Sequence, residues 1–371
     1  MHATSRTLAR DTTGVLAVAG VLAVAGALLV PVAVVTGYMA LQDFGEWNYQ
    51  GYVLGRALRG QSLGVATLKD HPVPYTLSNA LLGGLGAILP PLYAGVVAIF
   101  VQVLAGSVAV AWVIRARELD WRVALPVLAT LVVLGSGFWN GYAAHQLGLA
   151  VFTGWLALPR EHRTRPLLVL VFSLLLFFSH ALVFFYYAVA GGILALADRR
   201  VLRVALAALP SVALILWYAV HSPPEPAGGG VSMTSPVSWV AYKGYTFAKS
   251  GSYQNLIVNA VGDDRPLMFV GAAINVLMVG LVLLLAANLV LSVRLADWRR
   301  HADLVAGTVL VLVGLALPAF FLGIVNPGER LFGPGLILLA TAALEARVWP
   351  RLRALPPERP APACSSPVSR A

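Results

Sequence analysis

Long apolar segments separated by short polar stretches dominate the sequence of this chain. Several exceed the roughly 18 residues that mark a membrane span, whereas the shortest would reach only about 24 Å across a hydrocarbon core of about 30 Å. The shorter helices must therefore pack against neighbours or end beside polar cavities. We predict an all-α, polytopic transmembrane helix bundle of about ten spans, at residues 14–38, 92–114, 123–138, 143–158, 166–181, 182–197, 204–220, 267–293, 302–323 and 331–346.

Composition supports a membrane protein and argues against a soluble one. Hydrophobic residues make up 59% of the chain and charged residues only 11%. A soluble globular protein carries about 25% charged residues, so this chain has too few to cover a water-facing surface. The net charge of +10 comes from short, arginine-rich clusters between apolar segments. That placement is typical of cytoplasmic loops, so we expect no nucleic-acid partner.

The distribution of basic residues predicts the orientation. With the N-terminus inside, 19 of the 26 basic residues fall on the cytoplasmic side and 7 fall outside. If the apolar stretch 75–89 also spanned, 6 would lie inside and 20 outside, which inverts the positive-inside rule. We therefore expect 75–89 to be a helix at the outer interface, with both termini cytoplasmic. The excess of arginine over lysine and the absence of an Asn-x-Ser/Thr sequon favour a bacterial inner membrane.

The same topology predicts the domain organisation. Residues 1–346 form a single transmembrane domain with two long outer loops, 41–91 and 221–266, that we expect to be ordered. Residues 347–371 form a cytoplasmic tail rich in proline and arginine, which we expect to be disordered. The tail holds the lone cysteine, Cys364, so no disulfide and no cysteine-based metal site is predicted. At 25 residues, 14–38 is too long for a signal-peptide core and is interpreted as an uncleaved first span.

Two carboxylates just beyond the first span are the catalytic candidates. Asp43 and Glu46 lie in the segment Gln42–Tyr49, at the predicted boundary between membrane and outer loop. A carboxylate there is costly unless it is solvated or paired, which marks it as a candidate site residue. It could take a proton from an attacking hydroxyl as a general base. The alternative is an ordinary hydrated loop with interfacial aromatic residues.

Further polar residues on the predicted outer face are candidates for substrate binding. The alternatives are structural: a helix start, a hydrated helix turn, an interfacial aromatic belt with snorkelling lysines, or an internal ion pair. No Walker loop, GxSxG, HExxH or CxxC motif is present. The candidates are His71, Asn140, His145, His180, Trp239, Tyr242, Lys243, Glu329 and Arg330.

The order of these residues resembles the GT-C superfamily of polytopic membrane glycosyltransferases, which use polyprenyl-phosphate-linked sugars, and most of all its bacterial branch. An acidic residue, Asp43, follows the first span, and an hPxPY-like segment, His71–Tyr75, enters the interfacial helix. A GFxNxxxxxLGLAL-like run covers Gly137–Ala150, a polar residue, His180, lies at the next hairpin, and ERLFGP covers Glu329–Pro334. The similarity extends over residues 10–346.

The resemblance implies an inverting sugar transfer at the outer face, with Asp43 as general base and Arg330 holding the donor phosphate. His180 or Lys243 would assist, although His180 stands where several relatives carry lysine. No second acidic pair is evident, so a dependence on divalent metal stays open without support from the sequence, and the lipid-linked sugar is the donor that the resemblance implies. The chain lacks the large periplasmic domain of oligosaccharyltransferases, so a lipid or glycan acceptor is expected rather than a protein.

Two other classes stay open on the sequence. A transporter, flippase or lipid-glycan assembly protein would be non-enzymatic, but no inverted repeat is found and the polar residues collect at the outer face rather than at mid-membrane. A membrane glycan polymerase would also use an outer arginine and histidine. A functional requirement for Asp43 would favour the transferase.

Overall fold

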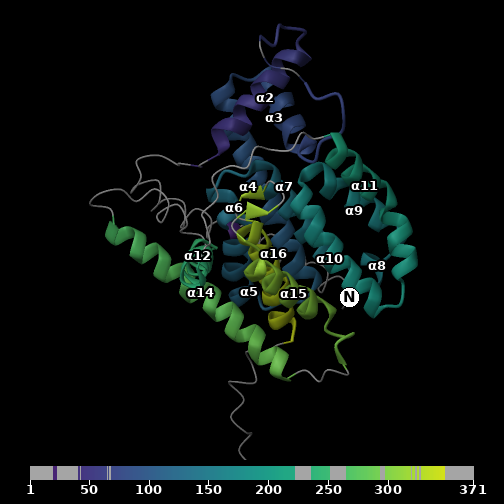
Figure 1. The fold of residues 1–371 in the computed structure, drawn as a ribbon, viewed down its shortest axis with the longest axis vertical. Coiled ribbons are helices and arrows are strands. Elements are labelled where there is room, and N and C mark those ends of the chain that lie inside the picture. The colour runs from purple at the N-terminus through teal and green to yellow at the C-terminus, as the bar shows by residue number, and fades with distance from the viewer. Residues whose placement is uncertain are drawn as a thin grey trace, which may run out of the picture.

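The computed structural model of the protein describes residues 20–22, 41, 43–64, 66, 68–221, 235–250, 265–292, 297–318, 320–321, 324–325 and 327–346. Most of the predicted first span 14–38, the proline-rich segment after His221 and the tail 347–371 lie outside these residues. The described chain is helical apart from two antiparallel two-residue strands, β1 (Phe320–Phe321) and β2 (Ile324–Val325). The predicted all-α class is confirmed (Figure 1).

The helices follow the predicted order of apolar segments. They are α2 (Phe44–Leu58), α3 (Thr76–Ile88), α4 (Pro91–Ala116), α5 (Trp121–Leu128), the π-helix η1 (Ala129–Val133), α6 (Ser136–Trp139), α7 (Ala143–Leu156), α8 (Arg160–Arg163), α9 (Pro166–Ser179), α10 (Ala181–Ala197), α11 (Val201–His221), α12 (Pro236–Lys249), α14 (Arg265–Ser292), α15 (Ala302–Ala316) and α16 (Pro327–Glu345).

Four helical segments are long and apolar enough to cross a membrane. Two of them, in α11 and α14, bury little of their surface inside the protein, and their exposed residues are mainly leucine, valine and aromatic. A water-soluble protein rarely exposes apolar surface over whole helices. Four shorter apolar helices accompany them. The long segments are Pro91–Ala116, Trp121–Trp139, Val201–His221 and Met268–Leu291, and the shorter helices are Thr76–Ile88, Pro166–Ser179, Ala181–Ala197 and Ala302–Ala316.

Glycines bring α15 and α16 into close antiparallel contact at the centre of the bundle (Figure 1). A Cβ added at Gly307 would lie 2.9 Å from the carbonyl oxygen of Gly335, and one added at Gly314 would lie 3.0 Å from that of Gly328. A larger residue at either pair would push the helices apart. This packing fixes the N-terminal turn of α16 beside the C-terminal turn of α15.

The first predicted outer loop contains two packed helices rather than one. Helices α2 and α3 run side by side in the same direction, and a Cβ added at Gly55 of α2 would lie 2.7 Å from the carbonyl carbon of Gly86 in α3. The guanidinium of Arg59 donates to the carbonyl oxygens of Gly86 and Ala87, at 2.9 and 3.2 Å, and so caps α3. The expectation that the two long outer loops are ordered stays a prediction, since residues 222–234 and 251–264 of the second loop lie outside the described residues.

Three predicted boundaries need correction. The segment 302–323 is not one helix: α15 ends at Ala316, because Leu317 precedes Pro318 and adopts an extended ψ of 141°. The segment 123–138 is interrupted after η1, so that α5, η1 and α6 share its length. The last helix begins at Pro327 rather than at residue 331, which places Glu329 and Arg330 in its first turn.

Candidate functional site

A tight turn between α6 and α7 fixes the position of Asp43. The backbone N–H of Asp43 donates to the carbonyl oxygen of Asn140 at 2.9 Å. Gly141 follows with a φ of +71°, and a Cβ added there would lie 2.5 Å from the backbone nitrogen of Phe44. Only glycine satisfies both the left-handed conformation and this close approach. The turn therefore sets where α2 begins and where its preceding carboxylate lies.

A buried polar network extends from this turn to α16. The side-chain amide of Asn140 donates to Oε1 of Glu329 at 2.8 Å. Nζ of Lys249, at the end of α12, lies 3.4 Å from Oε2 of the same carboxylate. All three side chains are buried. Since an unpaired buried carboxylate would be costly, the amide and the ammonium together satisfy the Glu329 side chain in this position.

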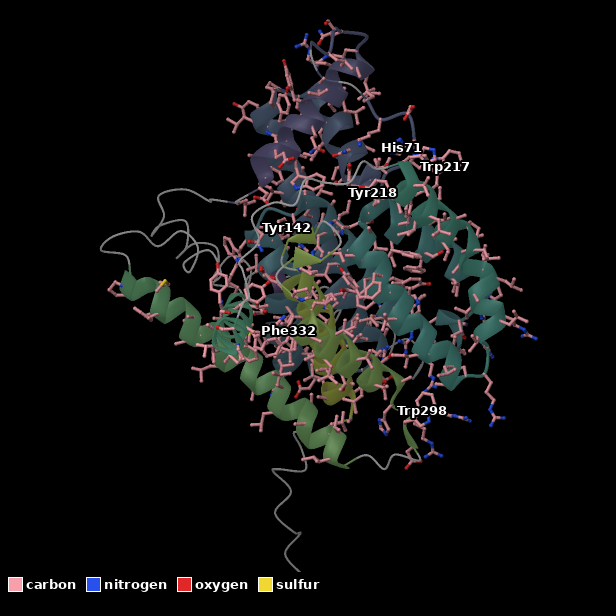
Figure 2. All side chains as sticks on the ribbon, viewed as in Figure 1. His71, Tyr142, Trp217, Tyr218, Trp298 and Phe332 are labelled. Atoms are coloured by element: carbon pink, nitrogen blue, oxygen red, sulfur yellow. The ribbon has the colours of Figure 1, made fainter. Side chains whose placement is uncertain are left out.

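Arg330, the next residue of α16, lies against an aromatic ring. Its guanidinium carbon is 4.2 Å from the centroid of the Tyr142 ring. A planar guanidinium stacks well on such a face while its N–H groups stay free to point elsewhere. The stack holds the Arg330 fork in one orientation without occupying it with a carboxylate. Figure 2 shows Tyr142 near the upper end of α16.

The charges around Asp43 define its acidity. Burial raises the pKa of the Asp43 carboxyl above its usual value, Arg330 and Lys249 lower it, and Glu46 raises it, with a net upward shift. Burial disfavours the Lys249 ammonium, but Glu329, Tyr245 and Tyr142 together outweigh burial, so the Lys249 pKa is raised. Asp43 thus lies in the field of two cations, Arg330 and Lys249. We call this set the Asp43–Arg330 cluster; its members are Asp43, Asn140, Tyr142, Lys249, Glu329 and Arg330.

Glu46, the second predicted carboxylate, faces solvent. It lies in the first turn of α2, is exposed, and accepts from Nε2 of Gln50 at 3.4 Å. It acts on Asp43 through its charge rather than by joining the buried network. The geometry therefore separates the two carboxylates that the sequence alone left equivalent.

His145 and His180 lie together at the side of this cluster. Their ring centroids are 5.5 Å apart at 87°, and Nε2 of His145 is 3.3 Å from the hydroxyl of Tyr186. Nδ1 of His180 accepts from the backbone N–H of Leu182 at 3.1 Å and caps α10. The positive charge of Arg330 acts electrostatically on both imidazole rings. A role for either histidine in binding phosphate stays a prediction.

Lys243 has structural partners in α15. Its ammonium donates to the carbonyl oxygen of Gly314 at 3.1 Å and to that of Leu317. The rings of Trp239 and Tyr242 lie 5.7 and 5.2 Å from the same nitrogen. A cation at the C-terminus of a helix stabilises the carbonyls that lack helical partners. Lys243 therefore caps α15, and a role for this set in binding sugar stays a prediction.

His71 is not brought to the cluster. Its Nδ1 lies 3.0 Å from the carboxylate of Asp70, and its ring lies 6.4 Å from that of Tyr218 and 5.9 Å from that of His221 at the end of α11. Figure 2 shows His71 beside Trp217 and Tyr218, apart from Tyr142. A shared site with Asp43 is therefore not supported for this residue.

Two residues of the cluster were not predicted as site residues. Tyr142 follows Asn140-Gly141, a dipeptide that signals a turn, yet no rule of spacing indicated that Arg330 would stack on it. Lys249 belongs to the aromatic and lysine-rich stretch of the second outer loop, where Lys243 was chosen instead. Within the described residues, no group of three or more histidine, cysteine, aspartate or glutamate side chains could hold a metal ion.

Comparisons with known proteins add no relative to this picture. A scan against protein-family models, a search of curated proteins and a search of solved structures each found no match to the chain. The functional argument therefore depends on the residues and their geometry.

Proposed function

We propose that the chain is a membrane glycosyltransferase. It moves a sugar from a polyprenyl-phosphate donor to a lipid or glycan acceptor at the outer face of a bacterial inner membrane. The observation that carries the proposal is the chain of hydrogen bonds from Asp43 through Asn140 to Glu329, the residue before Arg330. These bonds bring Asp43 and Arg330 together from opposite ends of the sequence, and the charge of Arg330 acts on the Asp43 carboxyl. A half-buried acid close to a guanidinium fork combines the two groups that this reaction needs.

The proposed reaction assigns one role to each of them. Asp43 takes the proton of the acceptor hydroxyl as its oxygen attacks the anomeric carbon. The bond between that carbon and the phosphate oxygen breaks, and the polyprenyl phosphate leaves with the electron pair. The planar guanidinium of Arg330 binds the leaving phosphate and stabilises its negative charge. Attack on the face opposite the leaving group inverts the anomeric configuration.

The acidity of Asp43 suits a base. Its pKa is raised, chiefly by burial, while Arg330 and Lys249 limit the rise. A base is most effective when its pKa approaches the working pH but it is still ionised. The buried pair of Lys249 and Glu329 supports the arrangement because it fixes the first turn of α16, from which Arg330 extends.

We propose the ten-span topology with both termini in the cytoplasm as the setting for this reaction. Residues assigned to outer segments contact one another, as Asp43 with Asn140 and Asn140 with Glu329. Residues assigned to cytoplasmic loops also contact one another: Arg160 pairs with Asp198 at 2.7 Å. This segregation supports the proposed order of spans, and the orientation of the bundle depends on the basic residues.

The decisive experiment compares two isosteric substitutions, Asp43→Asn and Glu46→Gln. Each variant is purified at equal membrane abundance, reconstituted, and supplied with a panel of labelled polyprenyl-phosphate hexoses and pentoses; transfer of label to lipid or glycan is measured. We expect Asp43→Asn to lower the rate about 10²- to 10⁴-fold, because Asn cannot accept the proton. Glu46→Gln should stay active, since Glu46 is exposed.

The other outcomes separate the alternatives. Loss of activity only in Glu46→Gln would assign the general base to Glu46, about one helical turn from Asp43, and the proposed reaction would stay the same. Full activity in both variants would contradict the proposed mechanism. In that case the transporter or assembly-protein interpretation would be taken up.

A further inference from the structure

A second polar site lies at the opposite end of the bundle from the Asp43–Arg330 cluster. A cavity of about 360 Å³ is lined by the end of α4, the segment from α7 into α8, the start of α15 and the end of α16. Helix α4 begins beside α2, where Asn48 donates to the carbonyl oxygen of Pro91 at 3.2 Å. Its 26 residues extend about 39 Å to Ala116 at the cavity. The cavity is therefore remote from the cluster; α8 lies away from α2 and α3 (Figure 1).

Two buried arginines of the cavity wall are held by carboxylates. Asp303 lies 3.1 Å from Nη2 of Arg117 and 2.7 Å from Nη1 of Arg163, and Glu345 lies 2.8 Å from Nη1 of Arg117. The side chains of Arg117 and Arg163 are 9% and 3% exposed. These pairs join α4, α8, α15 and α16, so they shape the cavity whether or not it holds a ligand.

The lining carries more positive than negative charge. Four arginines line the cavity, against the two carboxylates Asp303 and Glu345. A third carboxylate, Asp198, lies outside the lining and pairs with Arg160 at 2.7 Å. The side chain of Arg300 is exposed and makes no ion pair with any residue that the structure describes. The cavity is therefore a net positive site that reaches the surface.

One donor inside the wall also lacks a partner. Nε of Arg163 is buried and makes no hydrogen bond within the described part of the chain. The guanidinium of Arg163 also lies 5.3 Å from the ring centroid of Trp155, and Asp303 is its only carboxylate partner among the described residues. Alanine and leucine side chains, among them Ala157 and Leu194, form the apolar part of the wall.

We propose that this cavity binds a phosphate-bearing anion, with the headgroup of an acidic membrane phospholipid as its first source. Guanidinium forks match phosphate oxygens, and basic pockets between membrane helices at the cytoplasmic side take up such headgroups. Helix α10, which supplies Leu194 to the wall, packs against α11, whose exposed leucines offer a surface for acyl chains. Arg300 contacts the phosphate at the mouth of the cavity, and Arg163 contacts it inside the cavity.

The test measures binding by thermal stabilisation of the full chain in detergent at fixed ionic strength. The probes are short-chain phosphatidylglycerol, phosphatidylcholine with the same chains, and inorganic phosphate. Arg300→Gln is compared with Arg299→Gln, a matched control: Arg299 is adjacent, exposed, and lies over Trp298 at 5.8 Å without lining the cavity. We expect phosphatidylglycerol to stabilise the wild type and Arg300→Gln to weaken that binding about tenfold.

The arms distinguish the sources and can overturn the proposal. Stabilisation by phosphatidylglycerol alone assigns a lipid headgroup, and equal binding of inorganic phosphate assigns a soluble phosphate; either result supports the site. Equal effects of phosphatidylglycerol and phosphatidylcholine, no effect of any anion, or equal losses in the two arginine variants would overturn it. Sugar transfer is not measured, so this result is independent of the proposed enzymatic activity.

Discussion

At the arginine-lined cavity the buried guanidinium groups lie against carboxylates, whereas in the Asp43–Arg330 cluster the arginine lies against an aromatic ring. Arg117 and Arg163 share Asp303 at 3.1 and 2.7 Å. No ion pair joins Arg330 to another residue that the structure describes, although its guanidinium lies 4.2 Å from the ring centroid of Tyr142. The two ends of one bundle thus use arginine in different ways.

The difference separates charge that is paired within the fold from charge that the proposed reaction would use. A buried arginine already paired with a carboxylate is neutralised and joins helices, and its removal would leave an uncompensated charge. An arginine oriented by a ring keeps its fork available for a substrate phosphate. The carboxylates of the cluster divide in the same way. Glu329 is paired within the fold, because Asn140 and Lys249 satisfy it, whereas the charge of Asp43 is kept for the proposed reaction.

The largest expected effect tests the paired end. Asp303→Asn removes the carboxylate that Arg117 and Arg163 share; Arg117 keeps Glu345, but the buried Arg163 is left without a carboxylate, so we expect a loss of about 3–5 kcal/mol in the free energy of unfolding. The measurement is thermal or denaturant unfolding of the purified chain. Asp70→Asn is the matched control, because its side chain is 98% exposed and its pair with His71 should contribute almost nothing. Equal stability of the two variants would show that the buried network does not hold the helices.

The next effect tests the unpaired end. Arg330→Lys keeps the positive charge but loses the fork and the flat contact with Tyr142, so we expect kcat/KM for sugar transfer to fall about 10- to 100-fold with little change in stability. Arg56→Lys is the control, since Arg56 also lies over a tyrosine, 5.9 Å from the Tyr52 ring, but outside the cluster. Near-normal activity of Arg330→Lys would mean that charge alone is needed there.

The sequence predicted the helices well where an apolar run had clear ends. Helix α4 is predicted at 92–114 and covers Pro91–Ala116. The agreement is close because proline favours the first turn of a helix and Arg115 follows the apolar run. The end of α15 was missed because Pro318 lies inside an apolar stretch, and the hydrophobic signal there outweighed the helix-breaking one. The parallel arrangement of α2 and α3 was not predictable, since glycine spacing allows close packing in either direction.

The sequence predicted those residues of the candidate site that a local feature of the sequence marks. Asp43 and Arg330 were identified from charges that stand out beside apolar helices, a local property of the sequence. The contact with Tyr142 and the pair between Lys249 and Glu329 depend on how α7, α12 and α16 pack, which no local pattern encodes. His71 shows the reverse case: its surroundings suggested a site residue, but folding places it against α11.

The smallest expected effect concerns the pH dependence of the reaction and depends on the sign of one interaction. Burial raises the pKa of Asp43 and Glu46 raises it further, so the acid limb of kcat/KM should have its midpoint above the ordinary aspartate value of 3.8. Activity is lost as the pH falls through that midpoint, because a protonated Asp43 cannot accept the acceptor's proton. Glu46→Gln removes a negative charge that disfavours ionised Asp43, so the midpoint should move to lower pH while the plateau rate is kept.

The control is Asp70→Asn, which removes an exposed charge next to His71, outside the cluster, and should leave the midpoint unchanged. An upward shift in Glu46→Gln, or equal shifts in both variants, would mean that the titrating base is a group other than Asp43.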